Sequence, residues 1–304
     1  MPVKRKSKSG LERKLARWGW YFVSPAILFF SVFAFYPIIT AFVMSFHRKN
    51  MISLVKPVFV GFNNYITVLQ SPAFWNSVRA TTTFALGTFV PLTVFSLLLA
   101  AVIIGQKKIA LVWQLLFYSP AGLSSAVAAL IWYIIFQPTG LANQIVNALL
   151  FRSGVDMHWL SNGNMVQLST MIDYFWKYVG FFTILFITGL SKIPRGIYEA
   201  AKIDGAGRIQ TFFRITLPLL KPTTVLISIM TMIQCLKTFS TQYLFVQSGA
   251  PRAPIDVITL NIYFTAMREY NVGRASVMSI LLLITMLILT ILQFRFTRSD
   301  DVNY

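Results

Sequence analysis

The sequence is short of charged residues, and of acidic residues above all. Only 12% of its 304 residues are charged, and 56% are hydrophobic. A soluble domain normally carries about 25% charged residues. This shortage excludes an ordinary soluble globule and predicts a protein whose surface faces lipid.

Histidine and cysteine are almost absent as well, which removes the usual catalytic and metal sites. The chain has two histidines, His47 and His158, and one cysteine, Cys235. It contains no Walker loop, no His-Glu-x-x-His and no Gly-x-Ser-x-Gly. Asp173 is the only acidic residue inside an apolar segment. We therefore expect no enzyme activity, no catalytic residue, no metal site and no intrachain disulfide in this chain.

What the sequence has in excess is positive charge, with 27 Lys and Arg against 9 Asp and Glu. Such an excess can indicate nucleic-acid binding. Here most basic residues lie at the ends of apolar segments, which is typical of proteins that contact anionic lipid. The pattern predicts membrane lipid as a partner and no nucleic acid.

Six apolar segments are each long enough to cross a bilayer, which takes about 20 residues. They cover residues 18–46, 78–104, 109–136, 165–190, 219–246 and 273–296. Pro37 predicts a kink in the first segment, and Ser119-Pro120 predicts an interruption of the third. The sequence therefore predicts an all-α membrane protein with six transmembrane helices.

The basic residues also predict the orientation. Seventeen Lys and Arg lie on the side that holds both termini and the polar loop 191–218, and six lie on the other side. Loops rich in Lys and Arg face the cytoplasm. The first segment is too long for a signal sequence, whose apolar part has about 7–15 residues. We expect a basic cytoplasmic tail at 1–17, a membrane domain at 18–298 and a cytoplasmic tail at 299–304.

The cytoplasmic loop at about 191–218 has a helical pattern of its own. One helix face carries residues at four-residue spacing, namely Ile193, Ile197 and Ala201. Asp204-Gly205 then breaks the helix, because glycine reaches backbone angles that other residues avoid. A second amphipathic helix follows and is ended by Pro218, with one face made of Ile209, Phe212, Phe213 and Thr216. The pattern fits a surface linker or a docking site, and the apolar ridge favours docking of a cytosolic partner.

Polar and aromatic residues share a face on two of the membrane segments. On the fourth segment they are Tyr174, Lys177, Tyr178 and Phe181, and on the fifth Gln234, Lys237 and Thr241. Polar groups in lipid are costly and usually face a cavity or a partner. Aromatic rings beside hydrogen-bonding groups suit a sugar, so these residues predict a substrate pathway. The alternatives are contacts between helices, lysines reaching for an interface, and a local Asp173–Lys177 ion pair.

The cytoplasmic loop resembles a known family. Glu199-Ala200-Ala201, Asp204-Gly205-Ala206 and Ile215-x-Leu217-Pro218 are similar, at this spacing, to the Glu-Ala-Ala loop of binding-protein-dependent ABC importer permeases. Trp176-Lys177-x-x-Gly180-Phe181 and Gly273-x-Ala275-Ser276 resemble the carbohydrate-uptake branch, and within it the first permease of the maltose and glycerol-phosphate type. One departure is Gly249-Ala250-Pro251, where the family often has Gly-Gly-Pro.

The resemblance implies the type I permease fold of an ABC importer in a bacterial plasma membrane. It implies a second homologous permease, two cytosolic ATPase subunits and an extracytoplasmic solute-binding protein as partners. ATP and Mg would bind in the partner ATPase, and this chain would bind no cofactor. The loop would couple to the ATPase: Glu199 would pair with a basic residue there, Ala200 would allow close approach and Gly205 would turn the chain. The further coupling residues are Ala201, Asp204 and Pro218.

The expected function is therefore that of a permease subunit, which moves a sugar or oligosaccharide by alternating access. Lys177, Lys237 and Arg79 hint that the substrate is an acidic sugar or a sugar phosphate. The alternatives are a secondary transporter or channel working alone and a membrane scaffold without a substrate. The absence of inverted sequence halves argues against the first alternative.

Overall fold

The computed structural model describes residues 10–106, 109–151 and 154–297. Most of the predicted N-terminal tail and all of the C-terminal tail at 299–304 lie outside the described residues. The helices of the six predicted membrane segments are α1 (Gly10–Phe30), α2 (Tyr36–Ser45), α4 (Pro72–Ile104), α5 (Ala110–Tyr118), α6 (Ser125–Ile135), α8 (Gly163–Leu190), α12 (Lys221–Leu236), α13 (Ser240–Gln247) and α16 (Val272–Thr297). The other helices are α3 (Asn63–Leu69), α7 (Leu141–Leu149), α9 (Arg195–Ile203), α10 (Arg208–Thr211), α11 (Leu217–Leu219), α14 (Arg252–Ile255) and α15 (Ile258–Met267).

Within the described residues, five helical stretches are long and apolar enough to cross a membrane. They are Arg17–Ser45, Pro72–Ile104, Gly163–Leu190, Lys221–Gln247 and Val272–Arg295. A sixth is possible if Ala110–Gly122 and Ser125–Ile135 form one broken span. The all-α class and the six predicted segments are thus confirmed as helices, of which two are interrupted.

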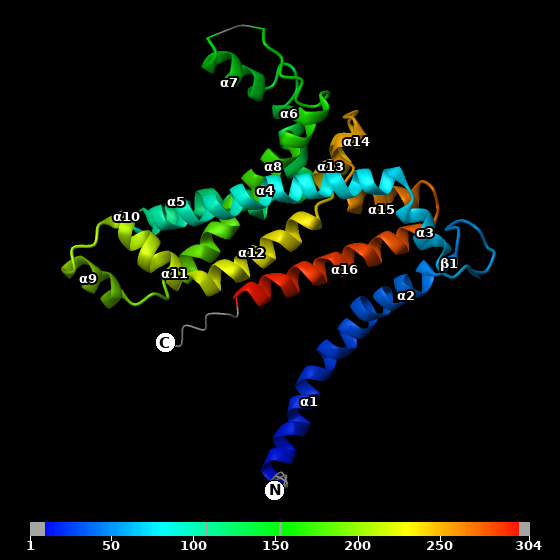
Figure 1. The fold of residues 1–304 in the computed structure, drawn as a ribbon, viewed down its shortest axis with the longest axis horizontal. Coiled ribbons are helices and arrows are strands. Elements are labelled where there is room, and N and C mark those ends of the chain that lie inside the picture. The colour runs from blue at the N-terminus through cyan, green and yellow to red at the C-terminus, as the bar shows by residue number, and fades with distance from the viewer. Residues whose placement is uncertain (1–9, 107–108, 152–153, 298–304) are drawn as a thin grey trace.

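The third predicted segment bends much more sharply than an ordinary kink. Its two halves, α5 and α6, meet at 98°. Ser119–Gly122 forms a 3-10 turn around Pro120, which has no N–H to continue an α-helix. The Ser124 hydroxyl then accepts a hydrogen bond from the Val127 N–H and so caps the start of α6. In Figure 1, α6 leaves the long helices and carries α7 away from them.

The first segment stands apart from the other helices. Figure 1 shows α1 diverging from the bundle while α2 runs toward its outer end. Ser31–Phe35 between them is a π-helical turn, and Pro37 lies at the start of α2. A wider turn just before the proline is a common way to relieve the clash of its ring with the preceding turn. Pro37 thus marks a local irregularity, as predicted.

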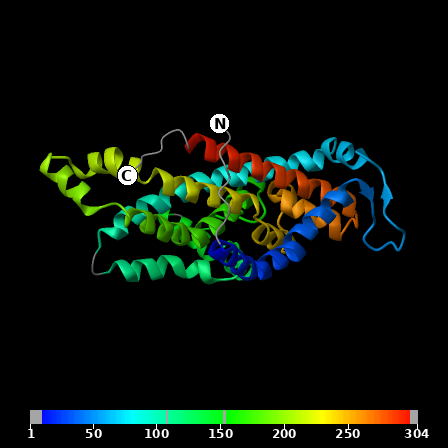
Figure 2. The same ribbon diagram turned by 90° about the horizontal axis from the view of Figure 1, so that it is seen from below.

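The core lies between α4, α8, α12 and the outer helix α15. Its fully buried side chains include Phe182 and Phe186 of α8, Leu92 of α4 and Leu260 of α15. A smaller apolar cluster lies farther out, around Phe136 and Phe245. After the end of α2, a short antiparallel hairpin is formed by β1 (His47–Arg48) and β2 (Val58–Phe59), which the all-α prediction missed. Figure 2 shows this hairpin and the loop with α9 and α10 at opposite ends of the long helices.

Gly180 lets α8 approach the end of α5 closely. A Cβ atom at this position would lie 1.9 Å from the Phe117 carbonyl oxygen and 2.2 Å from its carbon. Both are backbone atoms, so no side chain can move aside to make room. The glycine therefore fixes the distance between α8 and the bend after α5.

Gly180→Ala is accordingly expected to destabilise the protein by about 3 kcal/mol or more, because overpacking typically costs 1–3 kcal/mol even where neighbours can yield. The midpoint of thermal unfolding in detergent measures this effect. Gly19→Ala is the matched control, since a Cβ there meets nothing within 4 Å. Equal unfolding midpoints for the two variants would contradict the close contact.

Candidate functional site

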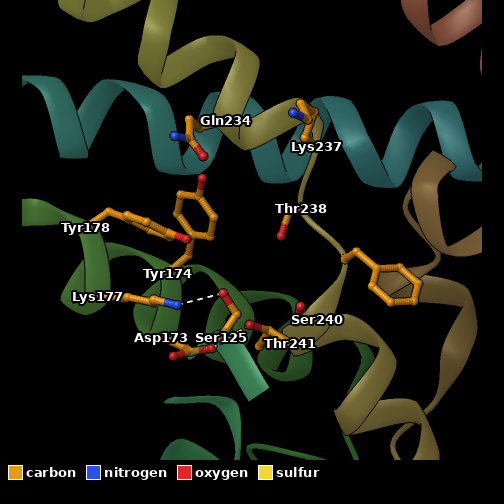
Figure 3. A pocket seen from close by; sticks show the side chains of 11 residues that line it. Ser125, Asp173, Tyr174, Lys177, Tyr178, Gln234, Lys237, Thr238, Ser240 and Thr241 are labelled. Carbon is orange, nitrogen blue, oxygen red and sulfur yellow. Dashed lines mark hydrogen bonds between the residues drawn. The ribbon is translucent and has the colours of Figure 1, made fainter. Parts of the chain in front are cut away.

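A polar cavity lies beside α8, at the breaks that interrupt the third and fifth predicted membrane segments. Figure 3 shows its side chains converging from α8, from the start of α6 and from the break between α12 and α13. The cavity volume is about 170 Å³. The lining residues are Ser125, Asp173, Tyr174, Lys177, Tyr178, Gln234, Lys237, Thr238, Phe239, Ser240 and Thr241. We call this the central cavity.

The structure brings together six of the seven residues predicted for the substrate pathway. Tyr174, Lys177 and Tyr178 come from α8, and Gln234, Lys237 and Thr241 from the α12–α13 region. Phe181 does not line the cavity. It lies half-buried against the main core, with its ring 5.2 Å from that of Phe182. Phe181 lies about one helical turn beyond Tyr178, where α8 no longer borders the cavity.

The two charged groups of α8 bind different partners. The Lys177 ammonium donates to the Ser125 hydroxyl at 2.6 Å, and the Thr241 hydroxyl donates to Asp173 Oδ2 at 2.6 Å. The predicted Asp173–Lys177 ion pair is therefore wrong. Each bond instead joins α8 to a neighbouring helix. Asp173 is 1% exposed, and its other oxygen, Oδ1, has no hydrogen-bond partner within the described residues.

Sequence reasoning missed several lining residues, namely Ser125, Asp173, Thr238, Phe239 and Ser240. Asp173 carried a signal, because it is an acid inside a membrane segment. Ser125 carried none, since only the 98° bend turns the start of α6 toward α8. Lys237–Phe239 interrupts the predicted fifth segment, and this break presents the other missed residues.

The cavity is suited to noncovalent binding of a polar molecule. Tyr174 and Tyr178 lie with their rings 4.5 Å apart, and the Lys177 nitrogen lies 5.2 Å from the centre of the Tyr178 ring. Lys177 and Gln234 add donors, and Asp173 adds an acceptor. No group of three or more His, Cys, Asp or Glu within the described residues could hold a metal ion. Aromatic faces beside hydrogen-bonding groups match a ligand with hydroxyls and an apolar ring face.

A second candidate site is the loop at 191–218, which was predicted to be cytoplasmic and whose first helix is α9. Gly205 ends this helix with φ +75°, a left-handed conformation that favours glycine. The Ala206 N–H donates to the Ala201 carbonyl, and the Gly205 N–H donates to that of Lys202. This pair of bonds is the Schellman ending of a helix, with Asp204 at the cap position. The predicted break at Asp204-Gly205 is confirmed.

The predicted coupling residues present mostly an exposed surface. Glu199 and Ala200 are exposed, while Ala201 is buried on the opposite face of α9. Glu199 makes no hydrogen bond or ion pair within the described residues. Exposed apolar side chains lie nearby in the chain, with exposed fractions of 87% for Ile203, 77% for Ile209 and 61% for Phe213. In Figure 1, α9 and α10 project beyond the ends of the membrane helices.

The second helix of the loop differs from its prediction. Pro218 does not end it, because α10 continues through a π-helical turn, Phe212–Thr216, into α11 around the proline. The π turn spaces residues differently from an α-helix. The predicted face is therefore split, with Ile209 and Phe213 exposed and Thr216 buried. The Thr216 hydroxyl also bonds the Tyr198 hydroxyl of α9 at 3.3 Å.

The fold and its central cavity define a membrane transport subunit. Residues 88–299 match the family described as "Binding-protein-dependent transport system inner membrane component". The chain belongs to this family, which confirms the resemblance seen in the Glu-Ala-Ala loop.

Similar proteins align with this chain along nearly its whole length. The arabinooligosaccharides transport system permease protein AraP of Bacillus subtilis is 32% identical, covering 91% of this chain and 88% of AraP. The sn-glycerol-3-phosphate transport system permease protein UgpA of Brucella abortus is 31% identical, covering 91% and 93%. A bacterial ABC transporter for import of the acidic polysaccharide alginate shares the fold, with TM-score 0.80, 22% identity and coverage of 96% and 100%.

Proposed function

We propose that this chain is a permease subunit of an ATP-driven importer, and that the central cavity carries a sugar or oligosaccharide into the cytoplasm. The observation that carries the proposal is the joint lining of the cavity by tyrosine rings, Lys177, Asp173 and Gln234. Rings stack on the C–H face of a sugar, and the polar groups bind its hydroxyls. Relatives named for arabinooligosaccharides and for trehalose and maltose support the same cargo class.

The partners in the proposed assembly are inferred from surfaces of the chain that are exposed in the structure. The exposed surface around Glu199 would bind one of two cytosolic ATPase subunits. The apolar helix α1, whose membrane segment is 0% buried, would contact lipid and a second homologous permease. A solved neighbour is a complex with an oligosaccharide-bound periplasmic protein, which supports an extracytoplasmic binding protein as the third partner. In this assembly both termini lie in the cytoplasm, as the basic residues predict.

Transport would proceed by alternating access. Closure of the ATPases on ATP would move the cytoplasmic loop, and the helices around the central cavity would tilt from an inward-open to an outward-open state. Such a rigid-body change needs only that ATP and the loaded binding protein favour one of the two states. ATP and Mg would act in the partner ATPase.

Reconstituted vesicles test the proposal with labelled maltose, trehalose, arabinotriose, sn-glycerol 3-phosphate and an alginate trisaccharide. We expect the complete assembly to import at least one of these compounds only when ATP and the binding protein are both present. A stand-alone transporter would instead import with the purified chain alone. ATP-independent import, or no import of any compound, would contradict the proposal.

A further inference from the structure

A second pocket lies outside the central cavity, between the end of α6, the loop before α8 and the end of α13. Its volume is about 210 Å³. Aromatic side chains of Tyr133, Phe136 and Trp159 line it together with polar side chains of Gln137, His158 and Ser248. None of these residues was singled out for binding from the sequence. We call it the outer pocket.

The aromatic wall of the outer pocket is held rigidly. The Phe136 and Trp159 rings stack at 5.2 Å with 29° between their planes. The Trp159 indole N–H donates to Asn143 Oδ1 at 2.9 Å. Asn143 is 2% exposed, and its amide nitrogen also binds the Pro138 carbonyl and Asp156 Oδ1. The ring orientation is therefore fixed before any ligand arrives, which lowers the entropy cost of binding.

One polar residue of the wall is held in an uncommon backbone conformation. His158 has φ +50°, which is rare outside glycine. Its backbone N–H donates to Asp156 Oδ1 at 2.9 Å, and its ring nitrogen Nδ1 lies 3.2 Å from Asp156 Oδ2. The His158 backbone N–H, and then Asn143, hold the pKa of the Asp156 carboxyl below its usual value. The carboxylate thus stays charged and keeps the His158 ring at the pocket wall.

Other polar groups of the outer pocket have unused hydrogen-bonding capacity. The Gln137 amide and the hydroxyls of Tyr133, Ser161 and Ser248 make no hydrogen bond within the described residues. Gln137 and Tyr133 are only half-buried, so water can reach and hydrogen-bond both side chains. A ligand with several hydroxyls could replace that water without leaving polar groups unpaired. An apolar ligand could not.

The outer pocket and the central cavity share two helices. Ser125 at the start of α6 lines the cavity, and Tyr133 near its end lines the outer pocket. At 1.5 Å per residue, they are about 12 Å apart along the helix. On α13, Thr241 lines the cavity and Ser248 follows the last turn at the outer pocket. Phe245 lies between them, fully buried, so side chains separate the two sites in this conformation.

We propose that the outer pocket is a second carbohydrate-binding site, where a sugar unit stacks on the Trp159–Phe136 wall before it reaches the central cavity. This proposal rests on the proposed function of sugar import. Because α6 and α13 line both sites, the imported sugar would occupy the outer pocket first and the central cavity next. Gln137 binds sugar hydroxyls, and Tyr133 and Ser248 complete the polar rim. Movement of α6 against α13 during transport would open the barrier at Phe245.

Gln137→Leu tests this site, because it removes the amide but keeps the shape of the side chain. Gln247→Leu is the matched control, since Gln247 is exposed on α13 beside the outer pocket but does not line it. The probe is whichever of the five compounds named above the wild-type assembly imports fastest. Its equilibrium binding to the complete assembly without the binding protein is measured by calorimetry, and its import is measured in vesicles.

Gln137→Leu is expected to raise the Kd of the free sugar by about 2- to 10-fold, the effect of one or two hydrogen bonds. Gln247→Leu should leave it unchanged. Equal Kd values for both variants and the wild type would overturn the site, even if ATP-dependent import remained and the proposed function stood. A defect in import with unchanged Kd would overturn it too, because the pocket would then serve docking of the binding protein. Absence of import by the wild type would instead count against the proposed function.

Discussion

Glu199→Lys is expected to lower ATP-driven import by roughly 30-fold or more while the protein still inserts into the membrane. Glu199 is exposed on α9 and has no ionic partner within the described residues. In the proposed assembly a basic residue of the ATPase would pair with it. Reversing one charge of such a pair typically costs at least about 2 kcal/mol of binding, which corresponds to the 30-fold loss.

Two measurements separate lost coupling from misfolding. Import into vesicles should fall, and the amount of ATPase that co-purifies with the permease should fall with it. Membrane insertion and the thermal unfolding midpoint should not change, because the side chain is exposed and makes no hydrogen bond or ion pair within the described residues. Glu269→Lys is the matched control, since it reverses an exposed charge at the other end of the molecule. Normal import by Glu199→Lys would contradict the coupling role.

The loop at 191–218 shows which features the sequence could predict. The local pattern predicted that the helix ends at Gly205. Its left-handed backbone conformation, with φ +75°, goes with hydrogen bonds from Gly205 and Ala206 to carbonyls of the preceding turn. The path after it was predicted incorrectly at Pro218. A proline excludes regular α-helix, but the sequence does not say whether the chain then stops or widens into a π turn. In the structure the π turn lies against α9, where the Thr216 hydroxyl bonds the Tyr198 hydroxyl at 3.3 Å, and such a contact between two helices is outside the reach of a local pattern.

The central cavity shows the same division. Spacing along α8 placed Tyr174, Lys177 and Tyr178 on one face, because helical periodicity is a local property. The sequence could not predict that Ser125 lines the cavity, because Pro120 predicts a break in the helix but not the 98° angle of that break. Gly180 helps to set that geometry by letting the Phe117 carbonyl approach, and this contact joins segments far apart in the chain. The partner of Lys177 therefore depended on tertiary structure alone.

Lys177→Gln is the second variant with a large expected effect, and it tests whether the imported sugar is acidic. Lys177 is 5% exposed and lines the central cavity with Lys237, against a single carboxylate, Asp173. The cavity thus favours an anion. A hydrogen bond to a charged group is worth about 1.5–3 kcal/mol, so import of an acidic sugar should fall by roughly 10- to 150-fold.

A neutral sugar should lose much less, because glutamine still donates a hydrogen bond to a hydroxyl, and a neutral bond is worth about 1 kcal/mol. The measurement compares import of acidic and neutral compounds by the same vesicles. Lys237→Gln should shift the comparison in the same direction but less, since Lys237 is exposed whereas Lys177 is buried, and exposed charges interact more weakly. Lys56→Gln, exposed in the outer hairpin, should change neither. Equal losses for acidic and neutral compounds would contradict this selection and would mean that Lys177 shapes the cavity without favouring an anion.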